Sequence, residues 1–128
     1  MQSKILLSRT FHLGVPTEDI QSTVNFYESL GFNLVRKEQN GDVPIAFLQA
    51  DNLMIEAYEN KQAVRCAGAL DHLCLDTPDI NAAYQNVCAL GYRIADPGVE
   101  ELPFWDCGIR FFKFYGPNDE IIEFCQKL

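Results

Sequence analysis

The chain of 128 residues is poor in basic residues, and this scarcity excludes several classes of partner. Ten Lys and Arg stand against 18 Asp and Glu, which gives a formal net charge of −8. Nucleic-acid binding requires a basic surface, so we expect no nucleic-acid partner. The sequence also lacks a signal peptide and any apolar run close to the roughly 18 residues of a membrane-spanning helix. We therefore expect a cytoplasmic protein without a membrane partner.

The five cysteines do not form the pattern of a disulfide framework. Their number is odd, and no two of them are spaced as C-x-x-C. This usage indicates reduced thiols, which the cytoplasm maintains. We expect Cys74 and Cys125 to line a cavity as small apolar residues, because no basic residue stands directly beside either one to activate it as a nucleophile.

Histidine is scarcer still, and the two histidines of the chain occur in matching local sequences. His12 lies in "FHLGVPT" and His72 lies in "DHLCLDT", an offset of 72 − 12 = 60 residues. The same offset aligns residues 12–32 with residues 72–92 without a gap. We infer that the chain is an internal duplication, because self-similarity at a fixed offset is the signature of a repeated structural unit.

The duplication also matches two glutamates near the end of each copy. "IAFLQADNLMIEAYE" (45–59) resembles "IRFFKFYGPNDEIIEFCQ" (109–126), with three extra residues in the turn of the second copy. This alignment places Glu56 over Glu123. Each copy therefore carries one histidine near its start and one glutamate in its last strand-like run.

Both copies predict the same order of elements, βαβββ. Thr17 and Thr77 are candidate N-caps of the helices, and Gly31 and Gly91 are the residues expected just beyond their C-termini. Each helix should then span about 13 residues. The expected strands lie at 8–15, 32–38, 44–50 and 53–59 in the first copy and at 69–76, 92–98, 108–115 and 120–126 in the second. The expected modules are 9–59 and 70–127, joined by a linker at 60–69 within a single domain.

Strand alternation places the repeated polar residues on one face of each sheet. His72 and Cys74 share a face of their strand, as do Glu123 and Cys125, while the aliphatic faces should lie against the helices. A buried glutamate is costly unless it is compensated, and binding a divalent cation with imidazole and carboxylate ligands would compensate it. Taken singly, a strand histidine is more often a satisfied core residue, and a strand glutamate more often faces solvent. The other interpretation of the repeat is a duplicated scaffold whose site has decayed to binding alone.

Two further runs, "FYESLGF" (26–32) and "GPNDEIIEF" (116–124), complete a resemblance to a known family. Paired βαβββ modules with histidine on the first strand and glutamate on the last resemble the vicinal oxygen chelate superfamily, across residues 9–127. That superfamily includes glyoxalase I, methylmalonyl-CoA epimerase, extradiol dioxygenases, fosfomycin-resistance transferases and metal-free bleomycin-binding proteins. The resemblance implies an α+β fold in which two tandem βαβββ modules form a curved mixed sheet around a metal-site cleft.

The ligand count selects among the members of this superfamily. The metal ligands that the resemblance implies are His12, Glu56, His72 and Glu123. A His-Glu-His-Glu set resembles the short bacterial glyoxalase I, a lactoylglutathione lyase. This implies a divalent-metal-dependent lyase or isomerase that acts on a small carbonyl compound through an enediolate. Zn, Ni, Co, Mn or Fe would suit the ligands. Glu123 is the first choice of catalytic base and Glu56 the second, and the resemblance also implies a homodimer.

Two alternatives remain open, an epimerase of the methylmalonyl-CoA type and a small-molecule binding protein without turnover. Glutathione as cosubstrate is in doubt, because Pro16 stands where glutathione-using glyoxalases carry an arginine, although Asn60 matches an asparagine of those enzymes. We expect the substrate pocket to include Asn60, Phe104, Trp105 and Arg110.

Overall fold

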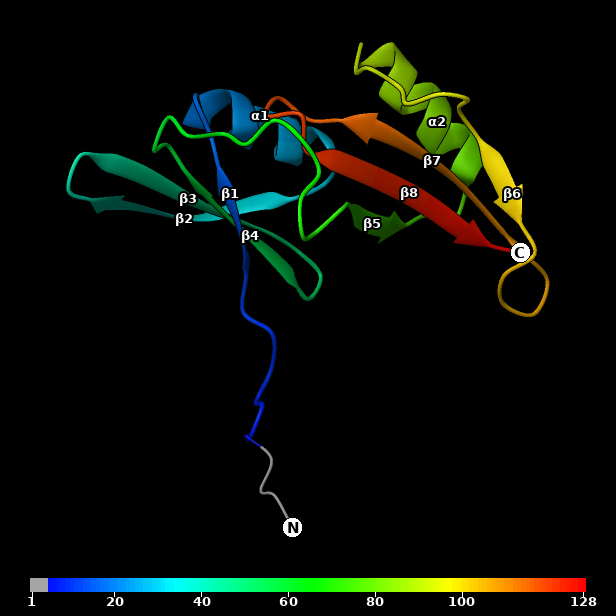
Figure 1. Cartoon of the computed structure of the whole chain (residues 1–128), viewed down its shortest axis with the longest axis horizontal. Coiled ribbons are helices and arrows are strands. Elements are labelled where there is room, and N and C mark those ends of the chain that lie inside the picture. Colours follow the sequence, from blue (N-terminus) through cyan, green and yellow to red (C-terminus); the bar gives the residue numbers. More distant parts are fainter. Residues whose placement is uncertain (1–4) are drawn as a thin grey trace. The chain divides into compact units, whose positions relative to one another are not determined.

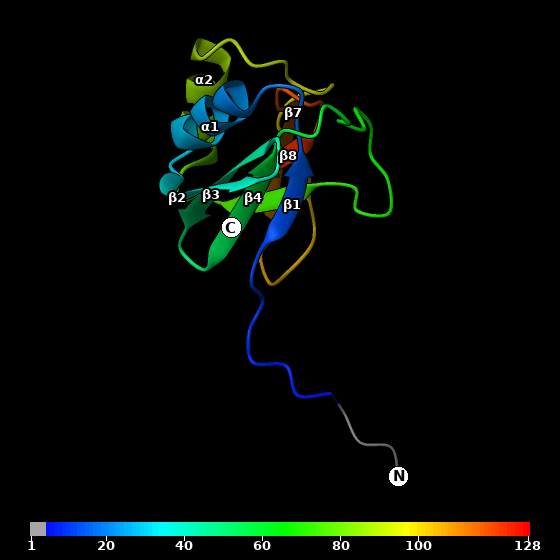
Figure 2. The ribbon, with the colours of Figure 1, turned by 90° about the vertical axis from the view of Figure 1, so that its left-hand side faces the viewer.

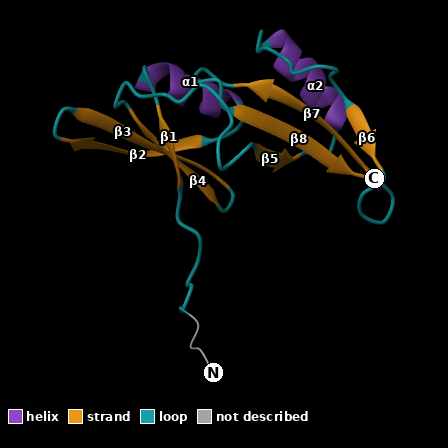
Figure 3. Cartoon of the chain, in the orientation of Figure 1, coloured by secondary structure: helices purple, strands orange, loops and turns teal. Residues whose placement is uncertain are grey.

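The computed structural model describes residues 5–128 and divides the chain into two compact units, residues up to 63 and residues 64–128 (Figures 1 and 3). The first unit contains, in chain order, β1 (Leu13–Pro16), α1 (Ile20–Ser29), β2 (Asn33–Asn40), β3 (Val43–Ala50) and β4 (Leu53–Tyr58). The second contains β5 (Leu73–Asp76), α2 (Ile80–Ala89), β6 (Glu100–Leu102), β7 (Ile109–Tyr115) and β8 (Ile121–Lys127). The predicted order βαβββ is confirmed in both units.

Each unit folds into one four-stranded mixed sheet with one helix. The strand orders are β1-β4-β3-β2 and β5-β8-β7-β6. The first and last strands of each unit are parallel neighbours, and the remaining pairs are antiparallel. This pairing brings the start of each repeat directly beside its end, which is the property that the candidate site depends on.

The helix of the first unit covers one face of its sheet (Figure 2). Val24, Phe26 and Tyr27 on α1 are buried, together with Leu48 on β3 and Ile55 on β4. Alternation along β4 gives the register, since Ile55 and Ala57 are buried while Met54, Glu56 and Tyr58 point to the opposite face.

In the second unit the core again lies between the helix and one face of the sheet. Phe112 and Phe114 on β7 and Ile122 on β8 are buried beneath α2, which contributes Ile80 and Val87. Full burial of side chains of this size contributes about 1.5–3 kcal/mol each. Within residues 5–128 the structure contains no helix that is long and apolar enough to cross a membrane.

The predicted helix starts are wrong by two residues. Asp19 and Asp79, not Thr17 and Thr77, are the N-caps, and both helices have 10 residues rather than about 13. The hydroxyl of Thr17 is used differently, because it accepts a hydrogen bond from the Asp19 amide at 3.0 Å and lies 2.8 Å from the hydroxyl of Thr23. The predicted glycines are confirmed, since Gly31 and Gly91 adopt positive φ angles of 105° and 82° just after the helices.

One predicted strand is also wrong. Residues 92–98 contribute only an isolated bridge from Ile94 to Phe114, and β6 begins later, at Glu100. Pro97 explains the displacement, because proline has no amide hydrogen to donate to a strand ladder. The first strand of each unit also starts later than predicted, at Leu13 and at Leu73. His12 and His72 therefore each precede the first paired residue of their strand by one position.

We expect Asp19→Ala to lower the free energy of unfolding by about 0.5–2 kcal/mol, because the Asp19 carboxylate accepts hydrogen bonds from the Gln21 and Ser22 amides. Urea denaturation followed by circular dichroism measures this change. Glu28→Ala, an exposed position of the same helix, is the control and should change the free energy by less than about 0.5 kcal/mol. Equal losses in both variants would mean that Asp19 does not stabilise the helix as a cap.

Candidate metal site

The first unit brings His12 and Glu56 together. β1 runs parallel to β4 with Gly14 in register with Glu56, so the histidine that precedes β1 lies beside the glutamate. The Nε2 atom of His12 is 3.2 Å from an Oε1 atom of Glu56, and the two side chains are 31% and 24% exposed. The His12 ring also contacts the rings of Phe11 and Phe47, with centroids 5.2 and 5.8 Å away. One imidazole and one carboxylate therefore meet on the face of this sheet that α1 leaves uncovered.

The second unit contains the same kind of His–Glu pair, and a further carboxylate contacts its histidine. The Nε2 atom of His72 lies 3.5 Å from Glu123 Oε1, and the Glu123 side chain is only 13% exposed. The opposite side of the ring is held by Asp71, whose Oδ2 atom lies 2.7 Å from His72 Nδ1. This hydrogen bond and the charge of His72 lower the pKa of the Asp71 carboxyl below its usual range.

Asp71 determines which nitrogen of His72 is free to bind a ligand. A carboxylate that accepts a hydrogen bond from Nδ1–H leaves the lone pair on Nε2, the atom that faces Glu123. Metal-binding histidines are typically held in this way by a carboxylate behind the ring. The first unit has Phe11 at the matching position, so ring packing rather than a carboxylate orients His12.

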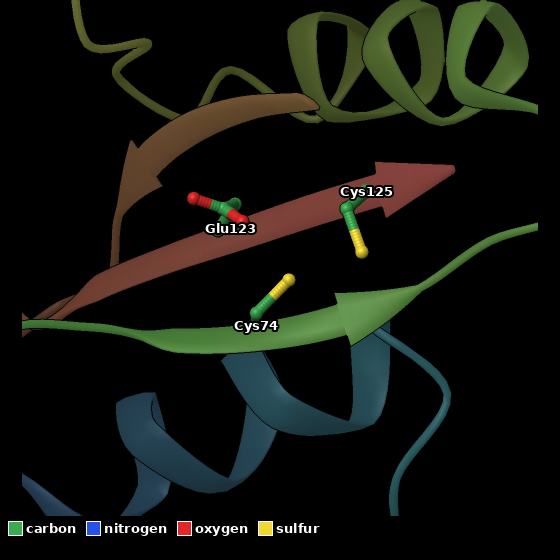
Figure 4. Close-up of side chains that lie close together, drawn as sticks. All are labelled: Cys74, Glu123 and Cys125. Carbon is green, nitrogen blue, oxygen red and sulfur yellow. The ribbon is translucent and has the colours of Figure 1, made fainter. Parts of the chain in front are cut away.

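Two thiols lie beside the second pair. Cys74, Glu123 and Cys125 come from the adjacent parallel strands β5 and β8, and their potential ligand atoms lie within 4.8 Å of one another (Figure 4). Partial burial and hydrogen bonds with Glu123 and Cys125 raise the pKa of the Cys74 thiol well above its usual range. Without a bound cation, Cys74 is therefore a neutral thiol.

Most of the chain matches a known family. The model of the Glyoxalase/Bleomycin resistance protein/Dioxygenase superfamily matches residues 9–124. The chain belongs to this superfamily. A relative from Bacillus subtilis (strain 168), the uncharacterized protein YwbC, is 30% identical over 131 residues, which cover 95% of this chain and 100% of the relative.

Solved structures of the superfamily share the fold. A glyoxalase family protein from Bacillus cereus has a TM-score of 0.79 at 16% identity, covering 100% of this chain and 99% of the other. A genomically encoded fosfomycin resistance protein from Listeria monocytogenes has a TM-score of 0.77 at 15% identity, covering 96% of each chain. The resemblance that the sequence predicted, and the fold that it implied, are confirmed.

The residues that we predict for a substrate pocket make contacts outside the two His–Glu pairs. Asn60 accepts a hydrogen bond from the Gln62 amide. Trp105 is exposed, with Lys127 Nζ 4.6 Å from its ring centroid, and Phe104 is exposed beside it in sequence. Arg110 lies on the same face of β7 as the buried Phe112, opposite to Glu123, and its Nε atom is 3.8 Å from Glu101. Their role in substrate binding remains a prediction.

Sequence reasoning missed two features of the second unit. The role of Asp71 could not be inferred, because it precedes β5 and alternation does not fix the direction of its side chain. The group of Cys74, Glu123 and Cys125 could have been found from alternation together with the parallel register, which pairs Cys74 with Glu123. From the sequence alone we expect these two thiols only to line a cavity.

We expect neutral His72 to carry its proton on Nδ1, because Asp71 accepts that hydrogen. The ring nitrogen chemical shifts of ¹⁵N-labelled protein at mildly alkaline pH measure the tautomer. In Asp71→Ala the His72 shifts should move toward the mixture of tautomers found in free imidazole. His12 is the control within the same spectrum and should not change, and a His72 spectrum that is insensitive to this substitution would contradict the assignment.

Proposed function

We propose that the two His–Glu pairs supply the ligands of a divalent metal in a lyase or isomerase of the glyoxalase I type. The observation that carries this proposal is that each unit places an imidazole Nε2 within 3.5 Å of a glutamate oxygen on its helix-free face. The ligand set is His12, Glu56, His72 and Glu123.

The donor atoms of both pairs fit a metal of this kind. Nitrogen and oxygen ligands stand about 2.0–2.2 Å from Zn and similar ions. At the angles of tetrahedral or octahedral coordination, two such ligands lie about 3.0–3.5 Å apart. The separations of 3.2 and 3.5 Å in the two units agree with this range. Imidazole and carboxylate are suited to Zn, Ni, Co, Mn and Fe.

The glutamates supply the proton transfer. A bound divalent metal would supply Lewis-acid polarisation of a substrate carbonyl. Glu123 is then the general base that takes the proton from the carbon next to that carbonyl. We prefer Glu123 to Glu56 because its side chain is 13% rather than 24% exposed, which shields it better from water. Returning the proton to the neighbouring carbon completes an isomerisation, and returning it to the opposite face of the same carbon completes an epimerisation.

The substrate that we propose is a small carbonyl compound, without a commitment to glutathione. Pro16 ends β1 and offers no charged group for a glutathione carboxylate. Metal analysis combined with turnover of hemithioacetals and of methylmalonyl-CoA tests the function directly. Failure to retain about one metal ion per site after incubation with Ni, Co, Zn or Mn would favour a binding protein.

The ligand and base roles can be separated with two variants. In His12→Ala the metal occupancy should fall, and activity should recover partly at high added metal, because only a ligand is lost. In Glu123→Gln turnover should fall about 10²- to 10⁴-fold and should not recover with metal, because the general base is lost. Steady-state kinetics over a metal titration measures both effects.

Glu28→Gln is the control for these variants, since this exposed residue lies on α1, outside both His–Glu pairs. It should leave activity and metal occupancy unchanged. Equal rescue of the His12 and Glu123 variants would reduce Glu123 to a ligand and transfer the base role to Glu56. Unchanged activity in both variants would contradict the proposed enzyme.

We also propose that the chain forms a homodimer, as the family resemblance implies. Each His–Glu pair supplies two ligands, and two pairs complete the set, whether they come from one chain or from two. Multi-angle light scattering at micromolar concentration should give about twice the mass of the chain, and a monomer under these conditions would exclude the dimer.

A further inference from the structure

We propose that the second unit alone forms a thiolate-containing metal site, made by Cys74, Glu123 and Cys125 with one further position for a water molecule, which selects thiophilic ions such as Zn²⁺, Co²⁺ and Cd²⁺. The ligand atoms of the three residues on β5 and β8 already lie within 4.8 Å of one another (Figure 4). Among residues 5–128 no second group of three His, Cys, Asp or Glu side chains reaches this proximity.

The convergence follows from the pairing of two strands. β5 and β8 are parallel, with Cys74 in register with Glu123 and Asp76 in register with Cys125. Alternation places Glu123 and Cys125 on the face of β8 opposite to the buried Ile122. Figure 4 shows the sulfur of Cys74 between the two strands, directed toward β8. The ladder between these strands therefore holds all three side chains in place.

Only a small movement separates this arrangement from a coordination shell. Zn–S distances of about 2.3 Å and Zn–O distances of about 2.1 Å at tetrahedral angles place the ligand atoms about 3.6–3.8 Å apart. The present separations of up to 4.8 Å must therefore shorten by at most about 1 Å. Small rotations about χ1 of the two cysteines can supply this movement without a change in the backbone.

His72 adjoins Glu123 but is not a member of the group of three ligand side chains. Its Nε2 atom lies 3.5 Å from Glu123, and Asp71 holds the opposite nitrogen. Two thiolates and a carboxylate form a soft set that prefers Zn²⁺, Co²⁺ and Cd²⁺ to Mg²⁺, Ca²⁺ and Mn²⁺. Lys113 is in register with Glu123 across β7 and β8, so its positive charge offsets part of the negative charge of such a set.

The first unit cannot form this site, although it has the matching strands. In the alignment of the repeats, Gly14 stands at the position of Cys74 and Tyr58 at the position of Cys125. A Cβ atom added at Gly14 would lie 3.2 Å from the ring of Tyr58, so the tyrosine fills the space that the thiols occupy in the second unit. The thiol pair is therefore specific to the second copy.

This site does not require the first unit, and it can exist whether or not the proposed function is correct. Cobalt(II) titration of the full-length reduced protein should produce thiolate-to-cobalt charge-transfer absorption in the near ultraviolet. Cys74→Ser and Cys125→Ser should each reduce this absorption, because one thiolate ligand remains, and should weaken Co²⁺ binding at least ~10-fold, since even the loss of a partner behind a ligand costs about 10- to 100-fold. Cys66→Ser, which changes an exposed cysteine outside the group, should have no effect.

The double variant His12→Ala, Glu56→Ala distinguishes this site from the four-ligand site. It removes the ligands of the first unit and should retain the charge-transfer absorption. Loss of the absorption in this variant, with the fold intact by circular dichroism, would overturn a site formed by the second unit alone.

A measurement on the unaltered protein avoids any effect of substitution on folding. X-ray absorption of the zinc-loaded protein should show two sulfur atoms at about 2.3 Å. A shell of nitrogen and oxygen alone would overturn the thiolate site, while it would leave the four-ligand proposal standing.

Discussion

The polar site of each unit depends on the burial of the opposite face of its sheet. One helix covers one face of a four-stranded sheet, and this burial fixes which residues of each strand point inward. Ile55 and Ile122 are 1% exposed, so Glu56 and Glu123, their next neighbours in sequence, must point the other way. A shift of one residue in register would bury both glutamates under the helices at a large cost in free energy. The aliphatic core therefore determines the position of the candidate ligands.

The same constraint explains how much of the molecule could be predicted from its sequence. Alternation and the internal repeat are sufficient for the order of elements and for placing the two histidines and the two glutamates on the faces that the helices leave uncovered. The predicted N-caps are wrong because threonine and aspartate are both good N-caps. Only the backbone geometry around Asp19 and Asp79 decides between the two residues. The strand predicted at 92–98 is wrong, because the prediction relies on the hydrophobic pattern of this segment and gives too little weight to Pro97. The combination of the two pairs in one ligand set stays a prediction, because it depends on how the two units associate.

The two copies have kept their scaffold and diverged around their histidines. Asp71 in the second copy corresponds to Phe11 in the first, so one histidine is oriented by a carboxylate and the other by aromatic packing. Such divergence is physically inexpensive, because both positions are exposed and do not disturb the core. The second copy therefore has a histidine whose tautomer is fixed by a hydrogen bond. In the first copy, packing against Phe11 and Phe47 holds the histidine ring.

The thiols of the second copy give the site a choice between two ligand sets that share Glu123. An ion that prefers nitrogen and oxygen gains nothing from Cys74, whose pKa is raised by its surroundings and whose proton must be displaced before the sulfur can bind. A thiophilic ion compensates for that displacement with two strong sulfur bonds and needs no ligand from the first unit. Such an ion also occupies Glu123, the proposed base, so binding through sulfur would oppose proton transfer. The identity of the metal would then determine whether the second unit contributes to catalysis or acts as a separate metal-binding site.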